Sequence, residues 1–213
     1  AHHGDAAAHL SNALGCEAVL ITSDNHAVLL RRSSAVATHS GLYNGPSGHP
    51  EPAHAGLGEA YPCGEAGCGG AAGSGHELFD MDQSVARLQS TASLPPDPDS
   101  RRAASELFDS VVQETVEETG IPRGALSAPL LLGVMTDACG KPDALFLLFT
   151  RLDAAAVRAT YDSGAAAHGW ESDRLQLVPC GRLLGGPDEL AASLGIRMTG
   201  VTRAAVECLR CVR

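Results

Sequence analysis

Hydrophobic positions in this chain come in short runs that are separated by polar turns. The stretch EAVLITSDNHAVLLRR, residues 17–32, holds two apolar runs on either side of Ser-Asp-Asn. Short runs bounded by turn residues predict two strands joined by a turn. The stretch PLLLGVMTDACGKPDALFLLFTRL, residues 129–152, repeats this pattern around Gly-Lys-Pro and predicts two further strands. A fifth strand is expected at residues 174–180.

Helical signals lie between and after these runs. Ser105 is a suitable N-cap, and Gly120 with Pro122 provides a stop, so a helix is expected over residues 105–119. Further helices are expected at residues 153–161, 187–194 and 201–212. Because strands and helices mix without regular alternation, the pattern predicts a single-domain α/β (α+β) protein with a mixed sheet.

Two segments lack such periodicity. Residues 41–52, GLYNGPSGHPEP, contain too much Gly, Pro and Asn for a regular element. Residues 53 to about 104 are of low complexity, and we interpret them as a mobile insertion in which residues 76–88 favour a short helix. We expect residues 1–11 to be a flexible N-terminus and residues 12–213 to form the domain.

Composition and charge exclude several classes of protein. The formal net charge of -10 over 213 residues argues against nucleic-acid binding, which needs a basic face. No apolar run approaches the roughly 20 residues that span a bilayer, so no membrane partner is expected. The chain has seven cysteines, and we expect their thiols to be reduced and unpaired. The alternative is a zinc site formed by the pairs Cys63/Cys68 and Cys208/Cys211. We expect an intracellular, cytoplasmic protein, with a lost targeting peptide as the open alternative.

The densest charge lies in the stretch QETVEETGI. On a helix, Glu114, Glu117 and Glu118 share a wedge of roughly 100° beside the apolar stripe. Like charges at these spacings repel, and residues 103–122 hold no Lys or Arg to offset them. A solvated acidic face is one interpretation. A site for Mg²⁺ or Mn²⁺ is the other, because hard cations prefer oxygen ligands and the backbone of Gly48 can approach closely enough to offer a carbonyl.

The stretches GPSGHPEP and QETVEETGI together resemble the two halves of the Nudix box, G-x5-E-x7-R-E-U-x-E-E-x-G-U, where U is apolar. The second half aligns without gaps, but Gln113 replaces the arginine and Ser105 stands in place of the first glutamate. The stretches GLYNGPSGHPEP, ELFDSVVQE and YDSG…HGWESDRLQLV narrow the resemblance to Nudix enzymes that hydrolyse nucleotide-sugars, such as the UDP-glucose/UDP-galactose pyrophosphatases. It covers residues 12–213 and implies a Nudix-type α/β/α sandwich.

This resemblance also implies a function. The expected reaction is metal-dependent hydrolysis of a nucleoside diphosphate sugar, with UDP-glucose or UDP-galactose favoured, to a nucleoside monophosphate and a sugar 1-phosphate. The implied cofactor is Mg²⁺, or alternatively Mn²⁺, and the implied partner is the small nucleotide-sugar; no oligomeric state is predicted. The alternatives are a GDP-mannose pyrophosphatase, a nucleotide-sugar binding module that lost catalysis with its box arginine, and an acidic interaction protein.

Site residues follow from the same resemblance. The implied metal ligands are Gly48, Glu114, Glu117 and Glu118. The implied catalytic residues are Glu114, Glu117 and Glu171, and the general base is left open between Glu114 and Glu171. Candidates for substrate binding are Arg31, Arg32, Tyr43, His49 and Glu51, with Asn12 and Trp170 as further candidates. An arginine would hold phosphate through paired hydrogen bonds, whereas an ordinary strand-end role is the alternative.

Overall fold

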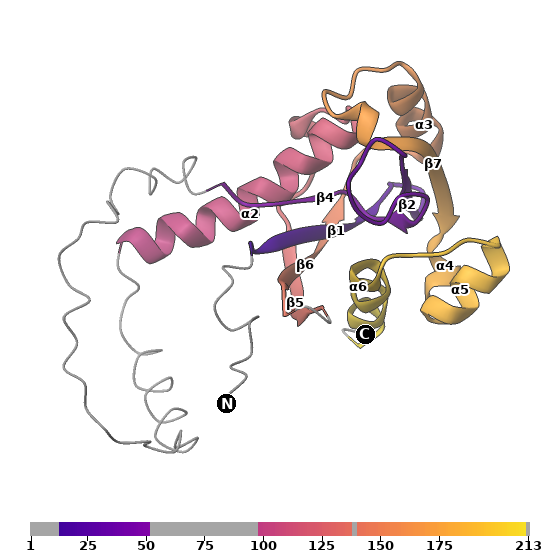
Figure 1. Ribbon diagram of the computed structural model, residues 1–213. Coiled ribbons are helices and arrows are strands. Elements are labelled where there is room, and N and C mark those ends of the chain that lie inside the picture. The colour runs from indigo at the N-terminus through magenta and orange to yellow at the C-terminus, as the bar shows by residue number, and fades with distance from the viewer. Residues whose placement is uncertain (1–12, 52–97, 138–139, 212–213) are drawn as a thin grey trace, which may run out of the picture. The chain divides into compact units, whose positions relative to one another are not determined.

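The computed structural model describes residues 13–51, 98–137 and 140–211 (Figure 1). These residues fall into two compact units. One is built from residues up to Pro50 and from Leu107 onward, and the other from Glu51 and residues 98–106. The expected flexible N-terminus, the expected helix at 76–88 and the pair Cys63/Cys68 lie outside the described residues.

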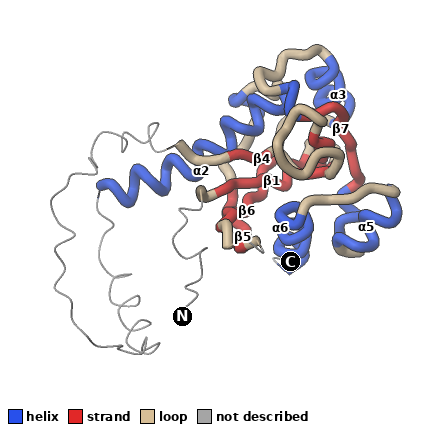
Figure 2. The backbone as a smooth tube through the Cα atoms, viewed as in Figure 1, coloured by secondary structure: helices blue, strands red, loops and turns tan. Residues whose placement is uncertain are grey.

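A mixed sheet organises the first unit (Figure 2). Its strands are β1 (Gly15–Ile21), β2 (His26–Arg32), β3 (Tyr43–Asn44), β4 (Ser47–Gly48), β5 (Leu130–Thr136), β6 (Pro142–Phe149) and β7 (Ser172–Pro179). They are arranged in the order β3-β2-β1-β6-β5, with β4 paired to β1 and β7 to β2. Only the pair β1 and β6 is parallel among these seven strands. All five strands predicted from the apolar runs are therefore confirmed.

One face of the sheet packs against residues 107–119 of α2 (Pro98–Thr119) and against α3 (Ala154–Asp162). Val111 and Val112 of α2 and Val157 of α3 join the core on this side. Asp153 caps α3, because its carboxylate accepts the N–H of Ala156 at 2.8 Å. The wedge expected on the glutamate-rich helix thus lies beside a buried stripe.

The other face packs against α4 (Cys180–Leu183), α5 (Pro187–Leu194) and α6 (Gly200–Cys211). Leu183, Leu190 and Ala205, one from each helix, are buried there. With helices on both faces, β1 is buried along its whole length. Figure 1 shows the two helical layers on opposite sides of the sheet, which confirms the α/β/α sandwich.

The limits of α2 differ from the expectation at one end. The helix begins at Pro98 rather than after a cap at Ser105. Proline suits the first turn of a helix, because the N–H that it lacks has no partner there. At the other end the prediction is confirmed: Gly120 adopts a φ of 76°, and its N–H donates to the carbonyl of Val116 at 2.8 Å.

The loop rich in Gly and Pro contains two short strands, so the expectation of no regular element there is wrong. Arg31 pairs with Tyr43 in β3, and Cys16 pairs with Gly48 in β4. Each strand has two residues, so the loop keeps an irregular path while its backbone is fixed against the sheet. The N–H of Ala18 also donates to the carbonyl of Pro46 at 2.9 Å. This anchoring sets the position of the site.

Two 3-10 helices, Arg123–Ala125 and Gly169–Glu171, complete the described elements. None of the helices in the described part of the chain is long and apolar enough to cross a membrane. The thiols of Cys16, Cys180, Cys208 and Cys211 are free.

Candidate active site

The loop through β4 meets the glutamates of α2. The N–H of Ser47 donates to Glu118 Oε2 at 3.2 Å, and the N–H of His49 donates to Glu114 Oε1 at 3.3 Å. Gly48 lies between these two donors, and a Cβ on it would collide with the Glu114 carboxylate. The loop and the helix therefore converge where the sequence pattern required them to, although their roles as metal ligands stay a proposal.

Burial and repulsion disfavour the charged forms of these carboxylates. Glu118 is 3% exposed, and its pKa is raised well above the usual value by burial first and then by Glu171 and Glu114. The pKa of Glu114 rises to about 7, mainly through burial and further through Glu117 and Glu171, although the His49 N–H opposes the rise. A cation placed among these groups would offset the repulsion between them.

Glu117 has two partners that orient it. Gln113 Nε2 donates to its Oε1 at 2.5 Å, and His168 Nδ1 lies 3.2 Å from its Oε2. The same imidazole lies 3.9 Å from Glu171 Oε1. Backbone bonding fixes this arrangement, since the N–H of His168 donates to the carbonyl of Glu117 at 2.8 Å. Gln113 thus supplies a hydrogen bond where the box arginine would stand.

The donor set fits a divalent cation. Ligand atoms from Glu114, Glu117 and His168 all lie within 4.8 Å of one another. Glu118 is adjacent, and both it and Glu114 have raised pKa values that a bound cation would lower. Carboxylate oxygens are the ligands that Mg²⁺ and Mn²⁺ prefer, and the imidazole of His168 lies beside them. His168 was missed in the sequence, where it opens the stretch HGWESD without a spacing that would mark it.

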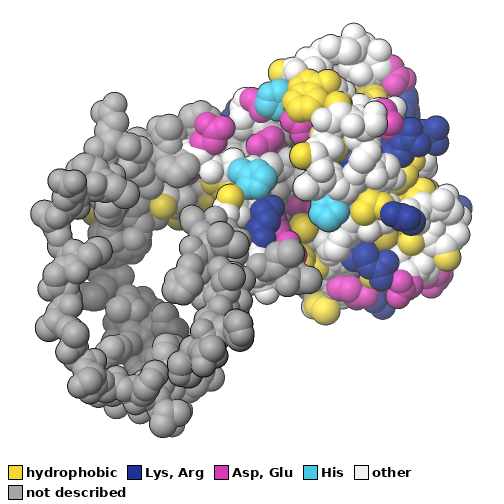
Figure 3. All heavy atoms as spheres, in the orientation of Figure 1, with side chains coloured by type: hydrophobic (Ala, Val, Ile, Leu, Met, Phe, Trp, Pro, Cys, Tyr) yellow, Lys and Arg dark blue, Asp and Glu magenta, His cyan; other side chains and the backbone are white. Residues whose placement is uncertain are grey.

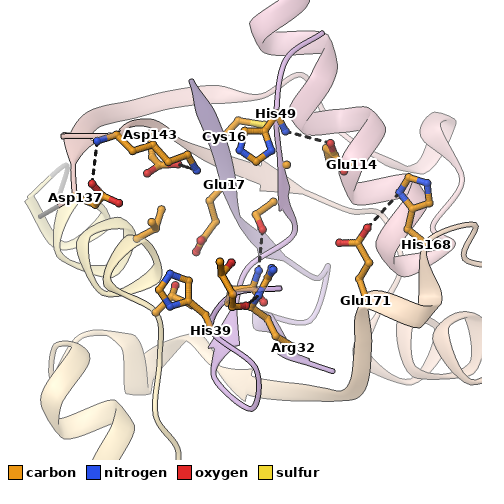
Figure 4. Close-up of a pocket in the computed structure, with 17 residues that line it drawn as sticks. Cys16, Glu17, Arg32, His39, His49, Glu114, Asp137, Asp143, His168 and Glu171 are labelled. Atoms are coloured by element: carbon orange, nitrogen blue, oxygen red, sulfur yellow. Dashed lines mark hydrogen bonds and ion pairs between the residues drawn. The ribbon is translucent and has the colours of Figure 1, made fainter. Parts of the chain in front are cut away.

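A cavity of about 510 Å³ extends from Glu114, whereas Glu117 and Glu118 are not part of its wall (Figure 4). Its wall includes Arg32, Gly48, His49, Glu114, His168 and Glu171. Figure 4 shows the labelled side chains of this wall coming from β2, from the loop after β4, from α2, and from His168 with the 3-10 helix Gly169–Glu171 that follows it. In the space-filling view, acidic, basic and histidine side chains gather on the face that is shown (Figure 3). Five of the ten site residues expected from the sequence therefore line one cavity: Arg32, Gly48, His49, Glu114 and Glu171.

Arg32 and His49 are the candidates of that wall that suit phosphate. The guanidinium of Arg32 is held by the carbonyl of Thr38, to which its Nε donates at 3.0 Å. The pKa of His49 is lowered, first because burial disfavours the imidazolium and then because Lys141 is near; Asp143 opposes this and Arg32 adds to it. The cationic side chains that act on His49 are therefore Lys141 and Arg32.

Other candidates lie elsewhere. Arg31 makes a two-bond pair with Asp173, at 2.6 and 2.9 Å, and this pairing raises the pKa of the arginine. Tyr43 is 5% exposed and packs in the core beside Met198. Neither is in the cavity wall. Of these three candidates, only Arg32 therefore lies where it could contact a substrate in the cavity.

Three further candidates have different positions. Glu51 lies in the second unit, where its backbone N–H donates to Glu106 Oε1 at 3.4 Å, so its role stays a prediction. Asn12 lies outside the described residues. Trp170 is exposed, and its carbonyl accepts the hydroxyl of Ser33 at 2.7 Å. The described contacts of Trp170 position the backbone next to Glu171.

The cavity also holds acids that sequence reasoning missed. Glu17 of β1 and Asp143 of β6 line it, together with Lys141. The pKa of Glu17 rises to about 7, chiefly through burial, while hydrogen bonds from Thr202 and Gly45 oppose the rise. An acid that opens an apolar strand run, as in EAVLI, is the signal that would have found Glu17.

Two curated proteins are similar in sequence to most of this chain. Nudix hydrolase 9 of Arabidopsis thaliana is 32% identical over 80% of this chain and 46% of its own length. Uridine diphosphate glucose pyrophosphatase NUDT22 of Mus musculus is 34% identical over 76% of this chain and 42% of its own length. A solved NUDIX hydrolase from Alicyclobacillus acidocaldarius aligns with a TM-score of 0.48 and 12% identity, over 95% of this chain and 93% of that one. No model of a known protein family matches the chain.

The part of the chain that these two relatives match belongs to the Nudix hydrolase superfamily. The resemblance drawn from the two halves of the Nudix box is confirmed. The chain spans less than half the length of the curated relatives that it matches.

Proposed function

We propose that this protein hydrolyses the diphosphate of a nucleoside diphosphate sugar, with a UDP-hexose such as UDP-glucose or UDP-galactose as the substrate. The observation that carries the proposal is the convergence of the β4 loop on Glu114 and Glu118 at the end of a cavity that also holds Arg32. The printed name of the mouse relative, a uridine diphosphate glucose pyrophosphatase, supports the choice of base and sugar.

In this proposal Glu114, Glu117 and Glu118, with the backbone of Gly48, hold Mg²⁺, and His168 adjoins this set. Mn²⁺ is the alternative ion. When bound, such an ion neutralises phosphate oxygens and lowers the pKa of water. The chain contributes the carboxylates that position it, and the partners of Glu117 and Glu118 keep these carboxylates oriented.

Arg32 and His49 bind the phosphate oxygens of the substrate in this proposal. A guanidinium offers two parallel N–H donors to a phosphate, which fixes the orientation of the diphosphate. Because the cavity wall is otherwise rich in acids, the guanidinium of Arg32 also reduces the repulsion that an anionic substrate meets on entry.

Glu171 is the general base that we assign, and Glu114 is the alternative. Water attacks one phosphorus, the bond from that phosphorus to the bridging oxygen breaks, and the carboxylate accepts the proton of the water. Glu171 is held for this by backbone bonds on both sides: its N–H donates to the carbonyl of His168 at 2.9 Å, and its carbonyl accepts the N–H of Ser33 at 2.8 Å.

The test is an assay of the purified chain with UDP-glucose, UDP-galactose, GDP-mannose and ADP-ribose, each with Mg²⁺, with Mn²⁺ and with a chelator. We expect UMP and hexose 1-phosphate from the UDP-sugars and no turnover with the chelator. Calorimetric binding of UDP-glucose without hydrolysis would instead favour the binding module, and a preference for GDP-mannose would replace the base and the sugar. Absence of both hydrolysis and binding for all four ligands would refute the proposal.

A further inference from the structure

The cavity has a second acidic end, away from the glutamates of α2. Glu17 and Asp143 line it and are 3% and 4% exposed. Their strands run parallel, with Gly15 opposite Asp143 and Glu17 opposite Leu145, so the two acids are diagonal neighbours on one face of the sheet. Figure 4 shows Asp143 and Glu114 on opposite sides of the cavity, with Glu17 between them.

Among the residues that the structure describes, one carboxylate oxygen of Asp143 has no hydrogen-bond partner. Its Oδ1 accepts from Lys141 Nζ at 3.0 Å, whereas its buried Oδ2 has no hydrogen bond within the described residues. A buried polar atom without a partner destabilises the folded state, so such atoms are rare unless a ligand or water satisfies them. The space for Asp143 and Lys141 depends on Gly15, since a Cβ there would collide with both. The unmatched oxygen therefore points to a ligand that donates a hydrogen bond.

Glu17 adds a second carboxyl group beside Asp143. Its Oε1 accepts the N–H of Gly45 at 3.2 Å, and Asp143 is one of the charges that act on it. A carboxylate oxygen only accepts hydrogen bonds, so an anionic phosphate or carboxylate, which offers no donor, does not match Asp143 Oδ2. The ligand group at this end is therefore neutral and rich in hydroxyl or N–H donors.

We propose that Glu17 and Asp143 form a subsite for the hydroxyl groups of a sugar ring of the substrate, an inference that rests on the proposed function. Each hydroxyl donates one hydrogen bond and accepts others, so adjacent hydroxyls match the unpartnered Asp143 Oδ2 and its neighbour. The pairing edge of uracil fits less well, because its single N–H lies between two carbonyl oxygens that would face the carboxylates.

The shape of the cavity supports this assignment. One continuous space of about 510 Å³ is lined both by Glu114 of α2 and by the Glu17–Asp143 pair, a size typical of small-molecule sites. A diphosphate held at the α2 end would place one of its two sugars, the hexose or the ribose, at the other end. Both the hexose and the ribose present an array of ring hydroxyls, and analogues that lack a single hydroxyl of one or the other distinguish the two sugars.

The experiment compares UDP-glucose with analogues that each lack one hydroxyl of the glucose or of the ribose. Wild-type protein, Asp143→Asn, Glu17→Gln and the control Asp188→Asn are assayed for kcat and KM. Asp188 is an exposed acid on α5 that pairs with Arg203 outside the cavity. We expect wild type and the control to lose about 10–100-fold in kcat/KM with one analogue, the cost of a hydrogen bond to a charged group. Asp143→Asn should treat that analogue and UDP-glucose nearly alike.

Two outcomes separate this subsite from the proposed function. If both cavity variants discriminate among the analogues as wild type does, the subsite is refuted while hydrolysis stands. If wild type hydrolyses no nucleotide-sugar, the proposed function fails, and calorimetry with the same ligands decides the subsite: equal affinity for every analogue overturns it, and one selective loss supports it. Glu17→Gln keeps an acceptor for the Gly45 N–H, so it carries the test if Asp143→Asn does not fold.

Discussion

The carboxylate of Glu114 occupies the space that a side chain on Gly48 would need. The neighbouring N–H of His49 donates to the same carboxylate at 3.3 Å. Any residue with a Cβ at position 48 would push the Glu114 carboxylate out of the site. Glycine is therefore required here whether or not its carbonyl is a metal ligand. The loop and the helix constrain each other directly.

Replacing Gly48 by alanine tests this coupling. The added methyl group must displace Glu114, so we expect kcat/KM for UDP-glucose to fall by about 10–100-fold, together with weaker binding of Mg²⁺. The control is Gly181→Ala, because a Cβ at Gly181 meets no atom within 4 Å. Gly48→Ala with wild-type kinetics and wild-type Mg²⁺ affinity would contradict the coupling.

Gln113 is expected to contribute to catalysis through Glu117, which it contacts at 2.5 Å. Gln113→Ala removes one of two partners of that carboxylate, so we expect a loss of about 10-fold in kcat/KM and a higher Mg²⁺ requirement. Gln113→Arg restores a donor with a positive charge and should retain or exceed wild-type activity. The measurement is a Mg²⁺ titration of all three proteins; identical titrations would show that Gln113 does not orient Glu117.

Glu17 predicts a specific dependence of stability on pH. Its pKa lies at about 7 rather than at the ordinary 4.5, so between these values the folded state binds more protons than the unfolded state. Stability rises with pH only where the unfolded state binds more protons, so this group makes the free energy of unfolding fall as the pH rises from 4.5 to 7. The fall attributable to Glu17 is about 3 kcal/mol.

Denaturant unfolding of wild type and Glu17→Gln at pH 5 and pH 8, with a chelator present, measures this effect. Glu114 adds a fall of the same sign in both proteins, so the difference between the two isolates Glu17. The variant should have the flatter profile. Parallel profiles would mean that Glu17 titrates normally in the folded protein.

Much of the fold follows from local signals. The helix expected at 187–194 matches α5 (Pro187–Leu194), and the stop after Thr119 matches the end of α2. These ends depend on Pro and Gly, whose backbone preferences act locally. The start of α2 at Pro98 was missed because the surrounding Pro, Asp and Ser also suit a loop.

The site was only partly accessible from sequence. Glu114, Glu117 and Glu118 could be found because a helix fixes their mutual spacing. His168 and Asp143 reach the cavity through the packing of distant segments, and no local spacing encodes this. Arg31 and Arg32 were equivalent in the sequence. The strand alternation separates them, because one pairs with Asp173 and the other lines the cavity.

The central claim is that Glu118 serves the chemistry rather than the fold. Its buried carboxylate accepts the Ser47 N–H at 3.2 Å, and an amide oxygen in Glu118→Gln can accept the same bond without the charge. The most direct measurement is the rate of UMP release from UDP-glucose at saturating Mg²⁺ by wild type, Glu118→Gln and the control Glu207→Gln, whose exposed carboxylate pairs with Arg210. We predict a folded Glu118→Gln protein with kcat lowered by about 100-fold or more and an unchanged control. A kcat for Glu118→Gln equal to that of wild type would contradict the account.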